Sequence, residues 1–442
     1  MTAPLLSFYG DDFTGSTDVM EALASNGIPT VLFLGPPDAH LWARFSYCRA
    51  IGIAGTSRSE SPDWMEENLT PVFEWLKALG ADYCHYKICS TFDSSPGVGS
   101  IGKAIEIGRQ VFAQRYVPLI VGAPQLKRYT AFGHLFAAYQ GENYRIDRHP
   151  VMSRHPVTPM RESDLRLHLA RQTALRTDLI DLALLRPQDG AARIQSVAAA
   201  CEGVLLFDVA DAESQRRAGE ELARLKPEGG WFAAGSSGLE YALLAFWREA
   251  GLLPERPVFA PPGKADRIAV VSGSVSPTTA RQIGHAGQNG FAALPVDPLA
   301  LAGENAESAA EDAVTAGLAA LQAGLSPLIH TALGPGADAG PGLEHIAGAR
   351  HRIGQGLGRI LRRLVEQARL TRAVIAGGDT SSHALTELGV EALTMLQPLP
   401  ATPGSPLCLA HGKGPAADSL QIALKGGQVG ADDYFSVIRS GG

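Results

Sequence analysis

Two adjacent carboxylates, Asp11 and Asp12, stand near the amino terminus, where the flanking pattern predicts a strand, a tight loop and a helix. An apolar run precedes them and helically spaced apolar residues follow them. This places both acids at the carboxyl end of a strand, the edge at which open α/β sheets bind ligands. Two acids there repel a polyphosphate and suit a general base, a magnesium ligand or an acceptor for sugar hydroxyls. The alternative is that Asp12 caps the helix and Asp11 is solvated.

Further polar side chains follow other expected strands. Arg58 comes after one strand, and Lys87 ends another, with Thr91 and Asp93 just beyond it. Because parallel strands end along one edge of a sheet, we expect these side chains near the Asp pair. Arg58 and Lys87 would hold a substrate carboxylate, each charged hydrogen bond contributing about 1.5–3 kcal/mol. The combination predicts a small polyhydroxy acid as ligand, although each basic residue taken alone would be a surface charge.

Small residues follow two strands of the C-terminal half, at residues 272–274 and 377–380. In each place a helix then begins with exposed amides, which is an arrangement that binds anions. One helix N-terminus contributes about 0.3–2 kcal/mol for an anion, whereas millimolar binding needs about 4 kcal/mol. A nucleotide therefore needs at least two such turns and magnesium, with residues 424–430 as a third glycine-rich wall. The alternative is that these glycines only permit close packing of strands and helices.

Composition and missing motifs exclude several classes of protein. The net charge of −7 over 442 residues gives no electrostatic case for binding nucleic acid or an anionic membrane. The five cysteines form no C-x-x-C pair, so we expect reduced thiols and a cytoplasmic protein. No apolar run approaches the roughly 20 residues of a membrane span. Neither a Walker P-loop nor H-E-x-x-H occurs. The glycines at residues 354–358 are assigned to helix packing, and His149 and His155 to an ordered loop rather than a metal site.

Strands and helices alternate along both halves of the chain. This predicts an α/β fold with two three-layer domains, mainly parallel sheets and a cleft between them. Four prolines within residues 254–263 mark a linker, which we place at 254–265. The expected domains are residues 1–253 and 266–442. Residues 127–159 break the alternation, and we expect a long functional loop or lid there.

Four motifs occur in the order found in the four-carbon acid sugar kinase family, which the chain resembles over nearly its whole length. They are residues 10–18 (GDDFTGSTD), 87–94 (KICSTFDS), 155–160 (HPVTPM) and 377–380 (GGDT). The resemblance implies ATP-dependent phosphorylation of an acid such as D-threonate, D-erythronate, 3-oxo-tetronate or the branched 3-oxo-isoapionate. Residues 31–37 look most like the branched-acid members.

The resemblance also implies an N-terminal substrate-binding domain and a C-terminal nucleotide-binding domain. By motif match, the ATP contacts would fall at Ser274, Gly377, Gly378, Asp379, Thr380 and Gly427. Residues 425–430 depart from the family's usual last motif, because they lack its hydroxyl residue and its Phe.

The sequence therefore predicts a magnesium- and ATP-dependent sugar-acid kinase. Asp12 would orient or deprotonate the attacking hydroxyl, with Asp11 and Asp93 supporting it, while Arg58 and Lys87 anchor the carboxylate. Closure of the domains would exclude water. Two alternatives stay open: a magnesium-dependent aldolase or dehydratase that uses no nucleotide, and a non-catalytic sensor of sugar acids. The metal ligands, the acid used, the hydroxyl that is phosphorylated and the formation of a homodimer are also left open.

Overall fold

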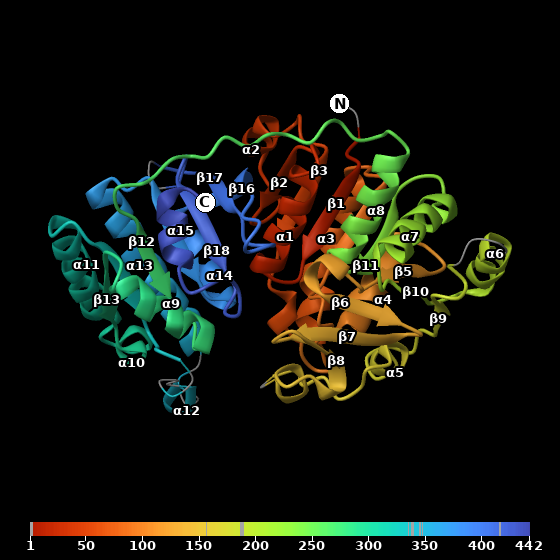
Figure 1. Cartoon of the computed structure of the whole chain (residues 1–442), viewed down its shortest axis with the longest axis horizontal. Coiled ribbons are helices and arrows are strands. Elements are labelled where there is room, and N and C mark those ends of the chain that lie inside the picture. The colour runs from red at the N-terminus through yellow and green to blue at the C-terminus, as the bar shows by residue number, and fades with distance from the viewer. Residues whose placement is uncertain are drawn as a thin grey trace. The chain divides into compact units, whose positions relative to one another are not determined.

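The computed structural model describes residues 3–155, 157–185, 190–334, 336, 340–343, 346, 348–414 and 417–442, without the side chains of Pro341 and Asp379. The chain divides into two compact units (Figure 1). The first unit contains residues up to Thr30 and Pro36–Pro257, and the second contains Val31–Gly35 and Val258–Gly442. The second unit therefore includes a short piece of the N-terminal region, which the sequence pattern does not indicate.

The first unit is built on a parallel sheet with the strand order β3-β1-β4-β11-β5-β10-β9. Its strands are β1 (Leu6–Gly10), β3 (Ala50–Ala54), β4 (Tyr83–Lys87), β5 (Val117–Ile120), β9 (Thr177–Ile180), β10 (Val204–Phe207) and β11 (Trp231–Gly235). Most of these strands are buried along their whole length. Continuous apolar runs are what a parallel sheet covered on both faces requires.

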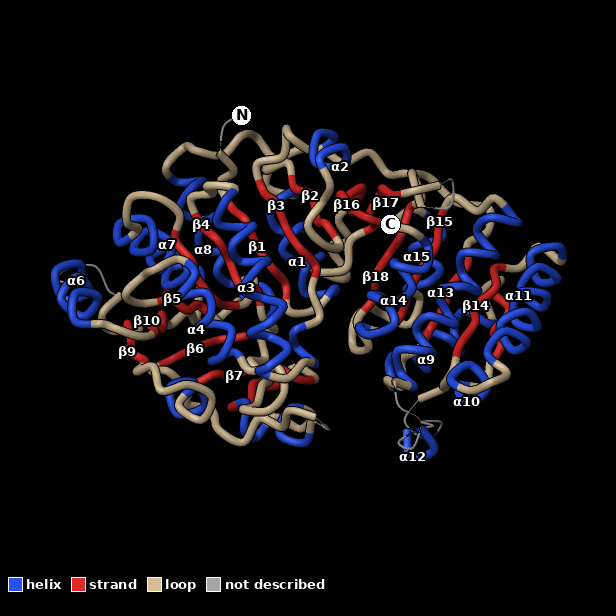
Figure 2. Tube along the Cα trace, turned by 180° about the vertical axis from the view of Figure 1, so that it is seen from behind, coloured by secondary structure: helices blue, strands red, loops and turns tan. Residues whose placement is uncertain are grey.

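Helices cover both faces of this sheet (Figures 1 and 2). On one face α1 and α7 pack against α8, and on the other α3 packs against α4. The helices are α1 (Phe13–Ala24), α2 (Ala39–Arg44), α3 (Pro62–Ala78), α4 (Ile101–Val111), α5 (Leu165–Leu169), α6 (Gly190–Ala200), α7 (Ala212–Leu225) and α8 (Gly238–Glu249). Buried rings join α3 to the sheet, because Phe73 meets the edges of Tyr9 and Tyr86 at centroid distances of 6.0 and 5.9 Å.

The second unit is also an α/β sheet, with the order β13-β14-β12-β15-β18-β17-β16-β2. The first five strands are parallel, and β17, β16 and β2 pair antiparallel in turn. The strands are β2 (Thr30–Phe33), β12 (Ala269–Ser272), β13 (Phe291–Pro295), β14 (Ser326–His330), β15 (Arg372–Ala376), β16 (Val390–Gln397), β17 (Leu407–Gly412) and β18 (Gln421–Lys425). Residues of β2 thus pair with a strand that comes from the C-terminal half of the chain.

Two groups of helices pack within the second unit. In one, α13 contacts α10, α11 and α14, and in the other α9 contacts α15. The helices are α9 (Pro277–Gly287), α10 (Pro298–Ala302), α11 (Ala306–Gln322), α12 (Gly340–Leu343), α13 (Ala349–Ala368), α14 (Gly378–Leu388) and α15 (Tyr434–Ser440). A Cβ added to Gly358 would lie 2.7 Å from the Cα of Ala384 in α14. The assignment of residues 354–358 to helix packing is therefore confirmed.

The prediction of a long loop at residues 127–159 is wrong. A separate antiparallel sheet occupies most of this segment, formed by β6 (Arg128–Ala131), β7 (His134–Tyr139) and β8 (Glu142–Arg145). Two tight turns contain Gly133 and Gly141, whose φ angles of 82° and 91° favour glycine. Short strands with polar outward faces explain why the apolar alternation is weak in the sequence.

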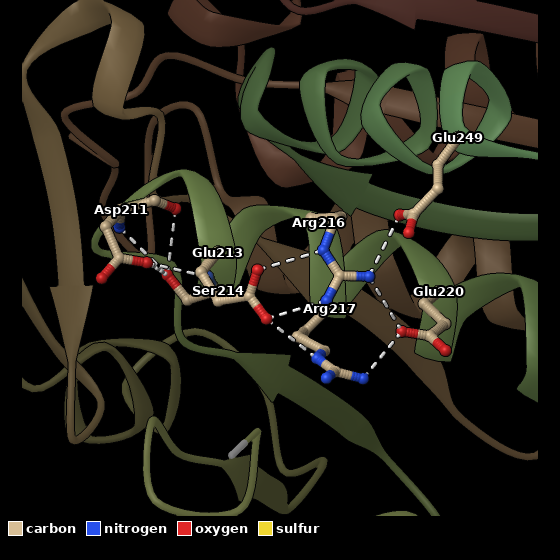
Figure 3. A network of polar contacts seen from close by, with 7 residues as sticks. All are labelled: Asp211, Glu213, Ser214, Arg216, Arg217, Glu220 and Glu249. Carbon is tan, nitrogen blue, oxygen red and sulfur yellow. Dashed lines mark hydrogen bonds and ion pairs between the residues drawn. The ribbon is translucent and has the colours of Figure 1, made fainter. Parts of the chain in front are cut away.

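Helix α7 carries a polar network on its outer surface (Figure 3). Asp211 caps the helix by accepting from the backbone of Ser214 at 2.8 Å, and the Ser214 hydroxyl completes a capping box. Farther along, Arg216 forms ion pairs with Glu213, Glu220 and Glu249, the last of which belongs to α8. These pairs are largely exposed, so water and salt screen them.

The two parts of this network predict different effects on stability. We expect Asp211→Ala to lower the free energy of unfolding by about 0.5–2 kcal/mol, because it leaves helix amides without an acceptor. Arg216→Ala should cost less, about 1 kcal/mol or below, because its ion pairs are exposed. Urea unfolding of both variants beside the unmodified chain measures the difference, and a larger loss for Arg216→Ala would contradict this ranking.

Candidate functional site

The ends of three neighbouring strands bring the predicted acid-binding residues together. Gly10, at the end of β1, pairs in register with Ala54 of β3 and Lys87 of β4. Beyond the strands, the Asp11 amide donates to the Lys87 carbonyl at 2.8 Å, and the Arg58 amide donates to the Asp11 carbonyl at 3.0 Å. The backbone therefore fixes Asp11, Arg58 and Lys87 at one edge of the sheet, as the sequence predicts.

Asp12 uses both of its carboxylate oxygens. Its Oδ1 accepts from the Gly15 amide and caps α1, while its Oδ2 accepts from Arg58 Nη1 at 3.0 Å. A Cβ on Gly15, in the first turn of α1, would lie 2.7 Å from Asp12 Oδ1 and 3.1 Å from Lys87 Nζ, so a larger residue there would displace these side chains. Asp12 therefore caps the helix, as the alternative interpretation predicts. Its role as the proton acceptor remains a prediction, and its occupied oxygens suit it poorly to that role.

Arg58 bridges two acids from the 3-10 turn η1 (Ser57–Ser59). Besides Asp12, it donates from Nη2 to Asp93 Oδ2 at 2.8 Å. Burial alone would lower the pKa of Arg58, but Asp93 and Asp12 raise it well above its usual range. For Asp93, burial alone would raise the pKa, but Arg58 and the hydroxyl of Thr91 lower it. Arg58 and Asp93 are therefore a charged pair at neutral pH.

Lys87 is also already paired. Its Nζ lies 3.7 Å from Asp18 Oδ2 on α1, and both side chains are almost fully buried. Burial would lower the pKa of Lys87, but Asp18 and then Asp11 raise it, so the ammonium stays charged. Asp18 belongs to the segment that the sequence singles out, yet its pairing with Lys87 was not foreseen.

Asp11 differs from its neighbours because it is buried without a complete set of partners. Only 5% of the residue is exposed, and its Oδ1 has no hydrogen-bond partner among the described residues. Burial, followed by repulsion from Asp12, raises the pKa of Asp11 to about 7, although Arg58 and Lys87 oppose that change. The alternative of a solvated Asp11 is therefore wrong. A carboxylate with a pKa near neutrality and a free oxygen is suited to accept a proton.

The segment after β4 is held in an unusual conformation. Phe92 is fully buried with φ of 58°, a left-handed angle that is rare for a bulky residue. It separates Thr91 from Asp93, and the Thr91 hydroxyl donates to Asp93 and also lies 3.0 Å from the Cys89 sulfur. Such conformations persist where the surrounding structure over-determines them, often at functional sites.

Thr158 adds a donor to the acid cluster from a distant part of the chain. Its hydroxyl donates to Asp93 Oδ2 at 3.2 Å, and its amide donates to His155 Nδ1 at 3.1 Å. Burial lowers the pKa of His155, so its imidazole is neutral near pH 7. Residues 155–160 form one of the motifs recognised in the sequence, but no contact of Thr158 could be predicted from it.

The predicted nucleotide contacts also meet at level strand ends, within the second unit. Ser272 of β12 pairs with Ala376 of β15, which pairs with Lys425 of β18. The turns that follow these three strands therefore leave the sheet side by side. After them, α9 and α14 begin. No side chain of the described residues caps α14, so its first amides can attract an anion, whereas at α9 Ser276 accepts from the Thr278 amide and Pro277 has no N–H.

Small residues line the junction between these turns. A Cβ on Gly427 would lie 3.2 Å from Ser274 Oγ, and one on Gly273 would lie 2.3 Å from Thr380 Oγ1. Gly377 has φ of 126°, and its amide donates to the Lys425 carbonyl at 2.9 Å. Ser274, Gly377, Thr380 and Gly427 thus lie together. Gly378 is exposed at the start of α14, and the prediction for the Asp379 side chain lies outside the described residues.

Lys425 is a buried cation beneath these turns. Its Nζ donates to Thr279 Oγ1 at 3.0 Å and to the Gly426 carbonyl at 2.9 Å, and Thr279 in turn lies 3.0 Å from Ser274 Oγ. It has no carboxylate partner among the residues described, and burial lowers its pKa to about 8. The sequence included Lys425 in a glycine-rich wall but gave it no role. A lysine at the last position of an apolar strand is the signal that was available.

The structure also bears on the predictions for the histidines and the cysteines. His149 accepts through Nδ1 from the amides of Val151 and Met152 at 3.2 and 3.1 Å, which fits its assignment to an ordered loop. No group of three His, Cys, Asp or Glu residues that could hold a metal ion occurs in the described part of the chain. All five cysteines are free, as predicted. Among the described residues, no helix is both long and apolar enough to cross a membrane.

Comparisons with known proteins cover the whole chain. Residues 6–243 match a sugar-binding N-terminal domain, and residues 269–435 match a nucleotide-binding C-terminal domain. A 3-oxo-isoapionate kinase of Paraburkholderia graminis is 49% identical, with 99% of this chain and 94% of the relative aligned. A 3-oxo-tetronate kinase of Cupriavidus necator is 31% identical, over 98% and 96% of the two chains. A solved structure from Salmonella typhimurium LT2 matches with a TM-score of 0.76 at 25% identity, over 98% of each chain.

Proposed function

The chain belongs to the four-carbon acid sugar kinase family, and we propose that it transfers the terminal phosphate of ATP to a hydroxyl of a 3-oxo-isoapionate-type acid. The observation that carries this substrate class is the 49% identity to a 3-oxo-isoapionate kinase along both chains. The two units support the proposal, because one gathers acids and bases and the other gathers small residues at helix N-termini.

Within the first unit, we propose that Asp11 rather than Asp12 receives the proton of the attacking hydroxyl. The substrate oxygen forms a bond to the terminal phosphorus, the bond from that phosphorus to the bridging oxygen breaks, and ADP leaves with the electron pair. The hydroxyl proton passes to the free Oδ1 of Asp11. Asp12 is less suited, because Gly15 and Arg58 occupy its oxygens. Positioning remains the larger part of catalysis in phosphoryl transfer.

Within the second unit, we propose that Ser274, the turn at residues 377–380 and Gly427 form the ATP site. The amides at the start of α14, which no described side chain caps, would face the phosphates, and Lys425 would place a positive charge beneath them. Its contact with Thr279, which itself lies against Ser274, would tie that charge to the turn after β12. Loss of the lysine should therefore affect the nucleotide more than the acid.

Magnesium would complement this site as part of Mg-ATP. Mg²⁺ in kinases is commonly held by phosphate oxygens and water, with one or two carboxylates, rather than by a protein cage. The described residues fit that mode, because they include no cluster of three His, Cys, Asp or Glu residues that could hold the ion without the phosphates. When bound, the ion would neutralise phosphate charge.

The test of the function is ADP release from Mg-ATP with a panel of acids. We expect turnover with 3-oxo-isoapionate, and slower or no turnover with 3-oxo-tetronate, D-threonate and D-erythronate. Faster turnover with a four-carbon acid would correct the substrate. Acid consumed without ATP would instead favour an aldolase or dehydratase, and binding of both ligands without turnover would favour a sensor.

Removing the proton acceptor gives the second prediction for the reaction. Asp11→Asn should lower kcat about 10²- to 10⁴-fold, the usual contribution of a general base, while calorimetry shows unchanged ATP binding. In the unmodified enzyme, kcat/KM should rise with pH through about 7, because Asp11 accepts a proton only once it is ionised. Asp12→Asn serves as the comparison and should move that rise to lower pH, because it removes the repulsion that helps raise the pKa of Asp11. An Asp11→Asn enzyme with full kcat would remove Asp11 from this role.

The buried lysine predicts how ATP affinity depends on pH. In the unmodified enzyme the KM for ATP should rise as pH increases through about 8, because Lys425 loses its charge there. Lys425→Met should raise the KM for ATP at pH 7 and abolish this further rise. The exposed Lys264 provides a matched control as Lys264→Met. A KM for ATP equal to that of the control would show that the charge of Lys425 is not used.

A further inference from the structure

The cations predicted to anchor the substrate carboxylate are already engaged. Arg58 donates to Asp12 and Asp93, and Lys87 is paired with Asp18. An incoming carboxylate would have to compete with buried acids for these partners. Separating a buried ion pair is costly, because it leaves a buried charge without its partner. If the chain phosphorylates a sugar acid, as proposed above, another cation should meet that acid.

Arg128 meets this requirement at the first residue of β6. It is half-buried, and no ion pair joins it to a carboxylate within the described ranges. Its Nη1 donates only to the carbonyls of Leu126 and Lys127, at 3.0 and 3.1 Å, and its Nε is buried without a partner. Part of a permanently charged guanidinium therefore remains available for an anion.

The fold places Arg128 at the same edge of the sheet as the acid cluster. Its backbone pairs with Ala123, with N–O distances of 2.9 and 3.1 Å, just after the end of β5. Gly235 of β11 pairs with Lys87 of β4 on one side and with Ile120 of β5 on the other, so these strands end level. Two strand spacings, about 10 Å, separate β5 from β4, a gap that an arginine and a small acid can span together.

Cys89 is an electrostatic neighbour of all three cations. Burial lowers the pKa of Arg128, and the Cys89 thiol opposes that change, as it does for Arg58 and Lys87. The Cys89 sulfur also lies 3.0 Å from the Thr91 hydroxyl, which donates to Asp93. Arg128 and the pair of Arg58 and Asp93 therefore share Cys89 as a neighbour at the same edge of the sheet.

We propose that Arg128 is a substrate-binding residue that holds the carboxylate of the sugar acid. Arg58 is then a positioning residue, because it fixes Asp12 and Asp93 and need not leave them. The Nε and Nη2 edge of the Arg128 guanidinium offers two parallel N–H donors, which match the geometry of a carboxylate. This residue would make the enzyme select an acid over the corresponding uncharged polyol.

The test compares Arg128→Gln with Arg128→Lys and with Arg148→Gln, a nearby arginine whose side chain is 75% exposed. We expect Arg128→Gln to raise the KM for the acid about 10- to 100-fold, as for loss of a charged hydrogen bond, with the KM for ATP unchanged. Arg128→Lys should recover part of that loss, and Arg148→Gln should match the unmodified enzyme. Thermal unfolding shows whether each variant is folded.

A second readout separates binding of the carboxylate from a purely structural role. The ratio of kcat/KM for the acid to kcat/KM for its primary amide should fall in Arg128→Gln, because the amide never used the positive charge. An equal loss for acid and amide, or an acid KM within twofold of the unmodified value, would overturn the proposal.

The kinase function and the role of Arg128 can fail independently. If the unmodified protein phosphorylates no acid of the panel, the function fails, and calorimetric titration with D-threonate then decides the role of Arg128. Binding to the unmodified protein that is at least tenfold weaker in Arg128→Gln supports the anchor. Equal binding, or none to either protein, overturns it.

Discussion

The bridge from Arg58 to Asp12 and Asp93 is the interaction on which the acid site depends. The Asp93 side chain is fully buried, and Asp12 is both the cap of α1 and a partner of the arginine. Without the guanidinium, Asp93 would be an uncompensated charge, and such losses cost up to about 3–5 kcal/mol in buried pairs. The bridge also ties η1 to the loop after β1 and to the strained turn at Phe92. Its strength is thus a structural requirement, which argues against using the same cation to capture a substrate.

The two units apply one architectural rule to opposite chemistry. In each, neighbouring parallel strands end in register, so that residues distant in sequence leave the sheet together. The first unit fills that edge with paired charges whose geometry is fixed by ion pairs. The second fills it with glycine, serine and threonine, and keeps the buried ammonium of Lys425 beneath them. Small side chains leave backbone amides accessible, as a polyphosphate requires, whereas paired charges suit hydroxyls and a proton.

Much of this arrangement could be predicted from sequence, because it follows from strand ends. Apolar runs followed by Asp11, Arg58 and Lys87 place these residues at one edge without knowledge of any contact. The partners of each charge could not be predicted, since the pairing of Lys87 with Asp18 depends on how α1 packs. The sheet of β6–β8 was missed because short, half-exposed strands leave little periodicity. That miss concealed Arg128, whose position depends on a backbone pairing with Ala123 that the sequence does not signal.

The environment that suits Asp11 to accept a proton also affects folding. A carboxyl whose pKa is raised to about 7 binds its proton more tightly in the folded chain than in the unfolded chain, where the pKa is near 3.8. Its contribution to stability is therefore fully present at low pH and is lost as pH rises through about 7. Asp93 acts in the opposite sense, because its pKa is lower in the folded chain than in the unfolded chain. It stabilises the folded chain at pH values above the pKa of the unfolded chain, and this stabilisation is lost in acid. Folding thus favours the neutral form of Asp11 and the ionised form of Asp93 within the same cluster. Arg58 lowers the pKa of both. Its guanidinium bonds directly to Asp93, which the Thr91 hydroxyl also stabilises as an anion, whereas Asp12 repels the charge of Asp11.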